Sequence, residues 1–218
     1  ALISNIYTIV DCIVAGQYEG PVASAALATI APLWNILFSV GLLFGIGGGV
    51  LLSQSRGAGD SGKGNRIFSA SVICTVSVII PVWLAVIFFD RQLLTFFGAD
   101  REILPYALEY VQWLKLAAPL FTLGQVASVF IKNDGSPGIT TAATVAGGVF
   151  NIAGDYYFVF TCDMGISGAG LATAIGQVIH IAILFSYFFT KKCGLRLVRP
   201  AGFKSMLKPI IATGFASF

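Results

Sequence analysis

The sequence has few charged residues, which narrows the classes of protein to which it can belong. Charged residues make up 11% of the 218 positions, against about 25% in a typical soluble domain. Hydrophobic residues reach 56% and the mean hydropathy is +0.86. No run of like charges occurs, and the formal net charge of +3 is too small to indicate nucleic-acid binding. These values exclude an ordinary soluble domain and indicate a membrane protein.

The four cysteines lack the spacing of a metal site or a disulfide framework. Cys12 and Cys74 fall inside apolar runs. A further apolar run separates Cys162 from Cys193, so these two residues are expected on opposite sides of a membrane and unable to pair. We therefore expect no zinc, no disulfide and no other cofactor.

Six apolar runs correspond in length, or nearly so, to the ~20 helical residues that cross a bilayer. They cover residues 1–15, 23–52, 67–89, 103–131, 139–160 and 169–189. The predicted fold is therefore all-α and polytopic, with a six-helix transmembrane bundle. The first run is too short for a full crossing and a fresh apolar run starts at Pro209, so we expect a fragment of a longer chain. Because six is even, a duplicated second half would enter the membrane in the same orientation, as a parallel repeat.

Basic residues are unevenly distributed over the connections between these runs. Ten of the thirteen lie after the second, fourth and sixth runs: Arg56, Lys63, Arg66, Lys132, Lys191, Lys192, Arg196, Arg199, Lys204 and Lys208. We expect the chain to lie in the plasma membrane. The positive-inside rule then places these connections and the amino terminus on the cytoplasmic side. We expect a six-helix lobe at residues 1–190, a basic cytoplasmic linker at 191–208 and the start of a seventh helix at 209–218.

Small residues recur at four-residue spacing in three runs and predict close helix contacts. The positions are Gly41, Gly45 and Gly49; Ala143, Gly147 and Asn151; and Ala172 and Gly176.

Two carboxylates inside apolar runs are the main functional signal. Asp11 and Asp155 would each cost about 2.5–3.5 kcal/mol near the centre of a bilayer, so such residues usually serve a function. Asn151 lies four residues before Asp155 and shares its helical face. Thr173, and Tyr7 four residues before Asp11, add oxygen atoms at comparable depth. Carboxylate, amide and hydroxyl oxygens suit Na⁺ or a proton.

Several other residues are secondary candidates. His180 lies about two turns beyond Thr173. It has two interpretations: a proton relay or, more simply, a buried hydrogen-bonding residue. Aromatic residues that would contact a substrate are equally explained by packing or lipid contact. They are Trp34, Phe38, Phe150, Tyr156 and Tyr157.

Two other functions fit the motifs poorly. The segment GAGDSGKG at residues 57–64 has Gly64 where a phosphate-binding P-loop needs Ser or Thr, so we expect no ATP site. Paired membrane aspartates also occur in intramembrane aspartyl proteases, with Tyr-Asp and Gly-x-Gly-Asp motifs. Here Val10 precedes Asp11, and Ile152 stands where the first glycine would be, which leaves the protease as a weaker alternative.

Four segments, in order between the expected helices, carry a family resemblance. They are YTIVDCIVAG, RGAGDSGKGNR, FIKNDGSPG and the Asn151-x-x-x-Asp155 pattern followed by Thr173. Together they resemble the amino-terminal half of a multidrug and toxic compound extrusion (MATE) transporter of the prokaryotic DinF-like and NorM-like type. The resemblance covers essentially the whole chain.

The resemblance implies a twelve-helix transporter in two six-helix lobes, of which this chain is one. It implies membrane lipid, amphiphilic small molecules and a carboxy-terminal lobe as partners, no enzymatic activity, and export of often cationic compounds against Na⁺ or H⁺. It further implies that Asp11, Asn151, Asp155 and Thr173 form the cation site of this lobe. A lipid-linked saccharide flippase of the same superfamily is an alternative, although the absence of Arg from the apolar runs favours cationic or neutral cargo.

Overall fold

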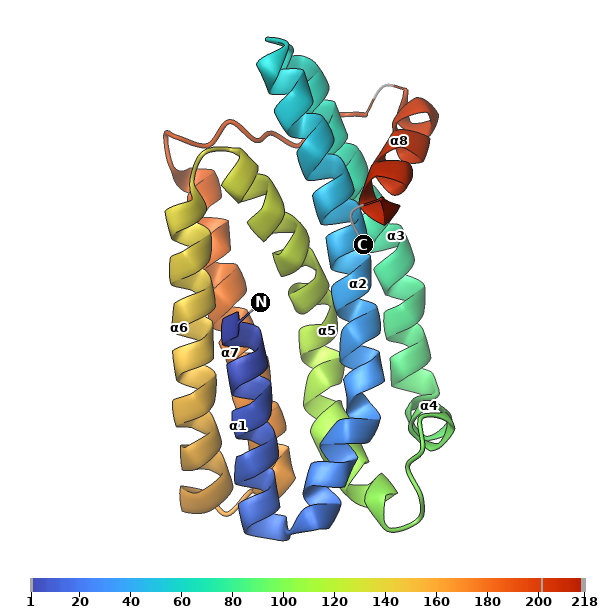
Figure 1. Cartoon of the computed structure of the whole chain (residues 1–218), viewed down its shortest axis with the longest axis vertical. Helices are drawn as coiled ribbons and strands as arrows, with labels where there is room; N and C mark the ends of the chain where they lie inside the picture. The colour runs from blue at the N-terminus through green and yellow to red at the C-terminus, as the bar shows by residue number, and fades with distance from the viewer. Residues whose placement is uncertain (1, 201, 217–218) are drawn as a thin grey trace. The chain divides into compact units, whose positions relative to one another are not determined.

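The computed structural model describes the backbone of residues 2–200 and 202–216, and the side chains among them from residue 9 onward. Every regular element within these ranges is helical (Figure 1). The elements are α1 (Leu2–Glu19), α2 (Pro21–Gly57), α3 (Ser61–Phe88), α4 (Asp90–Phe96), α5 (Ile103–Asn133), α6 (Pro137–Tyr156), a π-helical turn (Tyr157–Thr161), α7 (Gly165–Ser186), a 3₁₀ turn (Tyr187–Phe189) and α8 (Phe203–Phe215). The predicted all-α class is confirmed, and each of the six apolar runs forms a helix.

Four helices in the described part of the chain are long and apolar enough to cross a membrane by themselves. They are α2, α3, α5, and α7 together with its 3₁₀ turn. The other two predicted spans, α1 and α6, are the helices that carry Asp11 and Asp155. Length and composition therefore support a multi-pass membrane protein.

The chain divides into two compact units, and five helices contribute to both. Unit 1 comprises residues 1–36, 82–120 and 143–180, and unit 2 comprises residues 37–81, 121–142 and 181–218. Asp11 and Asp155 belong to unit 1. All ten basic residues of the predicted cytoplasmic connections belong to unit 2.

In unit 2 the glycine stripe of α2 packs against α5. A Cβ atom added to Gly41, Gly45 or Gly49 would lie 2.8, 3.3 or 2.6 Å from atoms of three α5 side chains that share the same four-residue spacing: Gln125, Val129 and Asn133. Only glycine allows this approach without displacement of a neighbour. The predicted helix contact is confirmed for this stripe.

Helix α8 begins at Phe203, six residues before the boundary that we predicted from Pro209. The reason is its apolar face, on which five residues follow the 3.6-residue period: Phe203, Met206, Leu207, Ile210 and Ile211. This face packs on a core of Phe44, Ile67, Ala70 and Cys74 within unit 2. Residues 203–208, which we expected in the linker, are therefore helical, and Pro209 lies inside α8.

Unit 1 contains one helix that the sequence did not predict. Helix α4 occupies seven residues of the connection between the third and fourth apolar runs. Its Leu94 is fully buried, and its first residue, Asp90, forms an ion pair of 2.6 Å with Lys115 of α5. Trp83 of α3 donates its indole N–H to the carbonyl oxygen of Lys115. These contacts hold the short helix against α5.

Candidate cation site in unit 1

Four helices of unit 1 bring five polar side chains together. Asp11 comes from α1, Tyr110 from α5, Asn151 and Asp155 from α6, and Thr173 from α7. All five are buried, and Asp155 has no exposed surface at all. In Figure 1, α1 lies beside α6 and α7, as these contacts require.

Thr173 is the centre of the hydrogen-bond network. Its Oγ1 donates to Asp11 Oδ2 at 3.2 Å and accepts from Asn151 Nδ2 at 3.0 Å. The Tyr110 hydroxyl lies 3.3 Å from both Asp11 Oδ2 and Thr173 Oγ1. Because a phenol has one proton, Tyr110 donates to only one of them at a time. The network links the carboxylate of α1 to α5, α6 and α7.

Four oxygen atoms of this site have no hydrogen-bond partner among the described residues. They are Asp11 Oδ1, Asn151 Oδ1 and both carboxylate oxygens of Asp155. Buried polar atoms are rarely left unpaired, so a group of four in one place needs an explanation. Asp155 lies beside Asp11, and two ionised carboxylates offer each other no donor. A shared proton or a bound cation would satisfy these oxygens.

Small residues allow the helices of the site to approach closely. A Cβ on Gly147 of α6 would lie 2.8 Å from the Gly176 carbonyl of α7, and a Cβ on Gly176 would lie 2.9 Å from the Gly147 carbonyl. The close helix contacts predicted for these two stripes are confirmed, and the structure shows that the two stripes contact each other. A Cβ on Gly170 would lie 3.0 Å from the carbonyl oxygen of Tyr110, so this glycine lets α5 approach α7 beside Thr173.

The carboxy-terminal half of α1, which contains Asp11, is also fixed by contacts within unit 1. Glu19 Oε2 accepts a hydrogen bond of 3.0 Å from the backbone N–H of Ile166, at the start of α7. The Tyr18 hydroxyl donates to Asp163 in the preceding loop. On the side of α2, Ser24 Oγ donates to the Cys12 carbonyl at 3.0 Å, one residue beyond Asp11. These contacts set the position of the Asp11 carboxylate.

All four residues that the sequence singled out for the site lie in one cluster: Asp11, Asn151, Asp155 and Thr173. The side chain of Tyr7 lies outside the described residues. His180 is buried next to Gly147, one turn of α6 before Asn151. It therefore lies beside the cluster, along the α6–α7 contact.

The aromatic candidates differ in their surroundings. Trp34 hydrogen-bonds the hydroxyl of Tyr110 and so borders the cluster. Phe150 lies beside Gly154, one residue before Asp155. Tyr156 is 67% exposed and packs on Phe160, which is typical of a surface aromatic residue. Phe38 belongs to unit 2, where it contacts Phe121.

Tyr110 is the member of the cluster that sequence reasoning missed. It stands in an apolar run among other aromatic residues, where a packing role was the simplest interpretation. A buried tyrosine hydroxyl needs a hydrogen-bond partner, but the sequence does not show that this hydroxyl is buried or which partner it faces.

The donor set of the cluster determines which ions suit it. It contains two carboxylates, one amide and two hydroxyls, all of them oxygen ligands of the kind that hard cations prefer. In the described part of the chain, no group of three His, Cys, Asp or Glu residues is arranged to hold a metal ion. The cluster itself thus offers oxygen atoms alone.

Comparison with known proteins agrees with this architecture. A family model described as MatE matches residues 1–157. The multidrug export protein MepA of Staphylococcus saprophyticus subsp. saprophyticus is 31% identical over the whole chain, and MepA of Staphylococcus aureus (strain MSSA476) is 30% identical. The chain spans about half the length of these relatives, 49% in each case.

A solved structure shows the same fold. A crystal structure of MATE in the bent conformation superposes with a TM-score of 0.89 at 22% identity, and the match covers 99% of this chain and 48% of that one. The chain therefore has the fold of one lobe of such a transporter.

Proposed function

We propose, from the premise that this chain belongs to the MatE family, that it forms one lobe of a secondary multidrug exporter. The full transporter would move amphiphilic, often cationic compounds out of the cell in exchange for inward movement of Na⁺ or H⁺. The relatives that cover the whole chain are named multidrug export proteins, which supports this substrate class.

The observation that carries the proposal is the group of four buried oxygen atoms without hydrogen-bond partners on Asp11, Asn151 and Asp155. A coupling ion must bind reversibly at a buried site and lose its hydration water there. Oxygen atoms that are already buried are suited to coordinate it. For Na⁺, these oxygens would be the protein ligands. For H⁺, the two carboxylates would share the proton.

Binding of a cation changes the forces on α1. Without it, the adjacent carboxylates of Asp11 and Asp155 repel each other across a low-dielectric contact. With a proton or Na⁺ between them, repulsion becomes attraction, and α1 is drawn toward α6 and α7. Movement of α1 would alter the substrate-binding surface of the lobe and so couple ion entry to substrate release.

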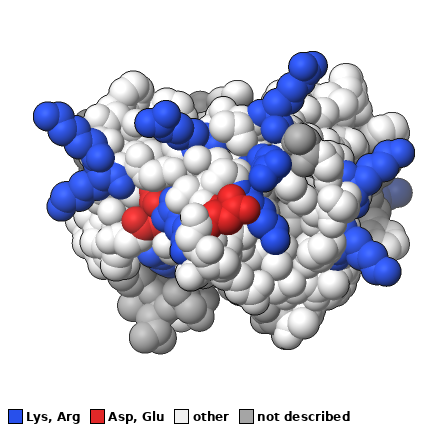
Figure 2. Space-filling model, turned by 90° about the horizontal axis from the view of Figure 1, so that it is seen from above, with Lys and Arg blue, Asp and Glu red and all other residues white. Residues whose placement is uncertain are grey.

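The distribution of charge supports the proposed orientation in the membrane. Unit 2 carries ten of the thirteen basic residues, whereas unit 1 carries eight of the ten acidic residues. Figure 2 shows a face on which Lys and Arg side chains far outnumber Asp and Glu. By the positive-inside rule, the basic connections of unit 2 and the amino terminus would lie in the cytoplasm.

Gradient-driven transport by the reconstituted full-length protein tests the proposal. Na⁺ and pH gradients are imposed separately on proteoliposomes, and export of a fluorescent amphiphilic cation is followed. We expect Asp11→Asn and Asp155→Asn to lose gradient-driven export, because an amide neither shares a proton nor neutralises a cation. Glu102→Gln is the matched control, since Glu102 is exposed at the start of α5.

Unchanged gradient-driven export in both aspartate variants would remove the coupling role from these residues. A saccharide flippase or an intramembrane protease would show no ion-driven export of an amphiphilic cation in the wild type, which separates those alternatives from the proposal.

A further inference from the structure

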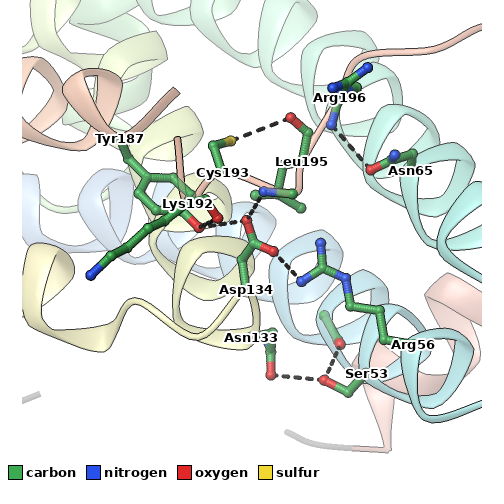
Figure 3. A network of polar contacts seen from close by, with 12 residues as sticks. Ser53, Arg56, Asn65, Asn133, Asp134, Tyr187, Lys192, Cys193, Leu195 and Arg196 are labelled. Carbon is green, nitrogen blue, oxygen red and sulfur yellow. Dashed lines mark hydrogen bonds and ion pairs between the residues drawn. The ribbon is translucent and has the colours of Figure 1, made fainter. Parts of the chain in front are cut away.

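The segment between α7 and α8 has a fixed path along unit 2. We call residues 193–198 the linker strap. The strap has no regular secondary structure, yet three of its backbone N–H groups donate to side chains of unit 2. Figure 3 shows this network from close by.

Asp134 holds the first anchor point. It follows the last residue of α5, and its side chain is only 2% exposed. Its Oδ2 accepts from the Tyr187 hydroxyl at 2.6 Å and from the Gly194 backbone N–H at 2.9 Å, and its Oδ1 forms an ion pair with Arg56. A buried charge with this many partners is costly to disturb, because removal of one partner leaves another uncompensated.

The second and third anchor points come from α3. Asn65 Oδ1 accepts from the Arg196 N–H at 3.1 Å, and Ser69 Oγ accepts from the Val198 N–H at 2.8 Å. The bonded strap residues are therefore 194, 196 and 198, the alternation expected when one edge of an extended chain faces the protein. Leu195, between the first two bonded residues of the strap, is buried, with 4% of its surface exposed.

Three residues of this network occur in two of the segments that carried the family resemblance and that have no role in the cation site. Arg56 and Asn65 belong to RGAGDSGKGNR, and Asp134 belongs to FIKNDGSPG. Both segments are polar helix ends in unit 2, about 70 residues apart in the sequence. The strap gives them a common structural role.

The strap also determines where α8 begins. Only four residues separate Val198 from Phe203, the first residue of α8. Because so short a connection can span only a limited distance, an anchored Val198 limits how far away α8 can begin. Helix α8 then packs its apolar face on the core of unit 2.

We propose that Asp134 is a positioning residue for transport: it anchors the linker strap on unit 2 and thereby fixes the start of α8 and of the chain that follows. This role rests on the proposed transport function. Asp134 lies in unit 2 and is no part of the cation cluster, so it acts through the linker and not through the ion. Loss of the anchor would leave substrate binding intact and slow the conformational cycle.

Limited proteolysis reports the state of the strap directly. Trypsin cleaves after Lys191, Lys192 and Arg196, whereas Pro200 blocks cleavage after Arg199. We expect Asp134→Asn in the full-length protein to raise the rate of cleavage at these sites by about tenfold or more, because cleavage follows the population of the detached segment. Tyr187→Phe removes one donor without creating an unpaired charge, and we expect a smaller increase.

Asp60→Asn is the matched control for charge. Asp60 is the other acidic residue of unit 2, it is exposed, and it accepts a hydrogen bond from the Lys63 backbone N–H at the start of α3. We expect its cleavage rate to equal that of the wild type. Equal thermal unfolding temperatures of all variants would show that cleavage reports local detachment.

Transport kinetics separate a positioning role from a purely structural one. We expect Asp134→Asn and Tyr187→Phe to lower the maximum export rate in proportion to strap detachment, with an unchanged dissociation constant for the fluorescent substrate. If trypsin cleaved Asp134→Asn at the wild-type rate, the anchoring role would be overturned. If cleavage were faster but the maximum export rate equalled that of the wild type, the positioning role would be overturned. Absence of ion-driven export by the wild type would overturn the proposed function and with it the transport role, while the cleavage result would stand.

Discussion

Thr173 and Tyr110 each contribute one proton to a cluster that has more acceptor than donor atoms. The Thr173 hydroxyl donates a hydrogen bond to Asp11, and its oxygen accepts one from the Asn151 amide. It therefore orients a carboxylate and an amide that come from different helices. The acceptors that remain, on Asp11, Asn151 and Asp155, are the atoms that the proposed coupling ion would bind.

Replacement of Thr173 tests this orienting role. We expect Thr173→Val to lower the free energy of unfolding by about 1–3 kcal/mol, because it removes the Thr173 acceptor from the buried Asn151 amide and one of the two donors near Asp11 Oδ2. Thr173→Ser keeps the hydroxyl and should remain close to the wild type. Thermal unfolding of the purified protein measures both variants, and equal loss of stability in the two would contradict the hydrogen-bond explanation.

Sequence reasoning found the charged and amide members of the cluster more readily than the phenolic one. A carboxylate in an apolar run is costly wherever it points, so Asp11 and Asp155 were visible without any structure. Tyr110 is amphipathic, and its role depends on whether its hydroxyl faces a partner. That orientation is set by the close approach of α5 and α7 at Gly170, which the sequence alone did not reveal.

At the level of helices, packing in both units depends on residues without a side chain. Gly147 and Gly176 bring the backbones of α6 and α7 into contact beside Asn151. In unit 2, Gly41, Gly45 and Gly49 do the same for α2 and α5. In a membrane, where burial of apolar surface drives little association, such van der Waals contact is a main source of helix pairing.

A larger residue at Gly147 should separate α6 from α7. We expect Gly147→Val to lower the free energy of unfolding by about 1–3 kcal/mol, the usual effect of overpacking, and to weaken ion-driven export because Asn151 moves away from Thr173. Val149→Leu is the control on the same helix, since Val149 is 60% exposed. An unfolding temperature for Gly147→Val equal to that of the control would argue against the close contact.

The apolar runs predicted where the long helices lie, but they did not predict where helices begin and end. The six runs all became helices because lipid requires every backbone polar group to be bonded within its own segment. The start of α8 was predicted six residues late because Pro209 was taken as a boundary, and the apolar period from Phe203 decided the outcome. Helix α4 was missed because it is short and is held by Leu94 and Asp90, contacts that a sequence does not display.

For the whole molecule, acidic and basic residues are distributed unevenly between the two units. The acidic residues, including the cation cluster, belong mainly to unit 1, and the basic residues and the linker strap belong to unit 2. The chain spans about half the length of the relatives that it matches, and it contains both the proposed cation cluster and the linker strap. The sequence did not predict the two units; it showed only that the basic residues lie mainly in alternate connections, the pattern from which the orientation was predicted.

Two native cysteines test the orientation of the whole molecule. Cys162 is exposed in the loop before α7, and Cys193 lies in the linker strap on the other side of α7. We expect a membrane-impermeant maleimide to label Cys162 in intact cells and Cys193 only in inverted vesicles. Burial raises the pKa of the Cys193 thiol, so its reactive thiolate forms at higher pH and its labelling should accelerate as the pH rises.

The cysteine labelling has an internal control. A Cys162→Ser variant should lose all labelling in intact cells, which assigns the signal to that residue. Labelling of Cys193 from outside intact cells would reverse the proposed orientation.

Cation occupancy of the purified full-length protein tests the central claim most directly. Binding of radioactive sodium, and proton release in weakly buffered solution on addition of the export substrate, are measured for the wild type and for Asp11→Asn, Asp155→Asn and Glu102→Gln. We expect the wild type to give at least one of these two signals, both aspartate variants to lose it, and Glu102→Gln to retain it. Full retention of the signal by both aspartate variants would contradict the claim that Asp11 and Asp155 hold the coupling ion.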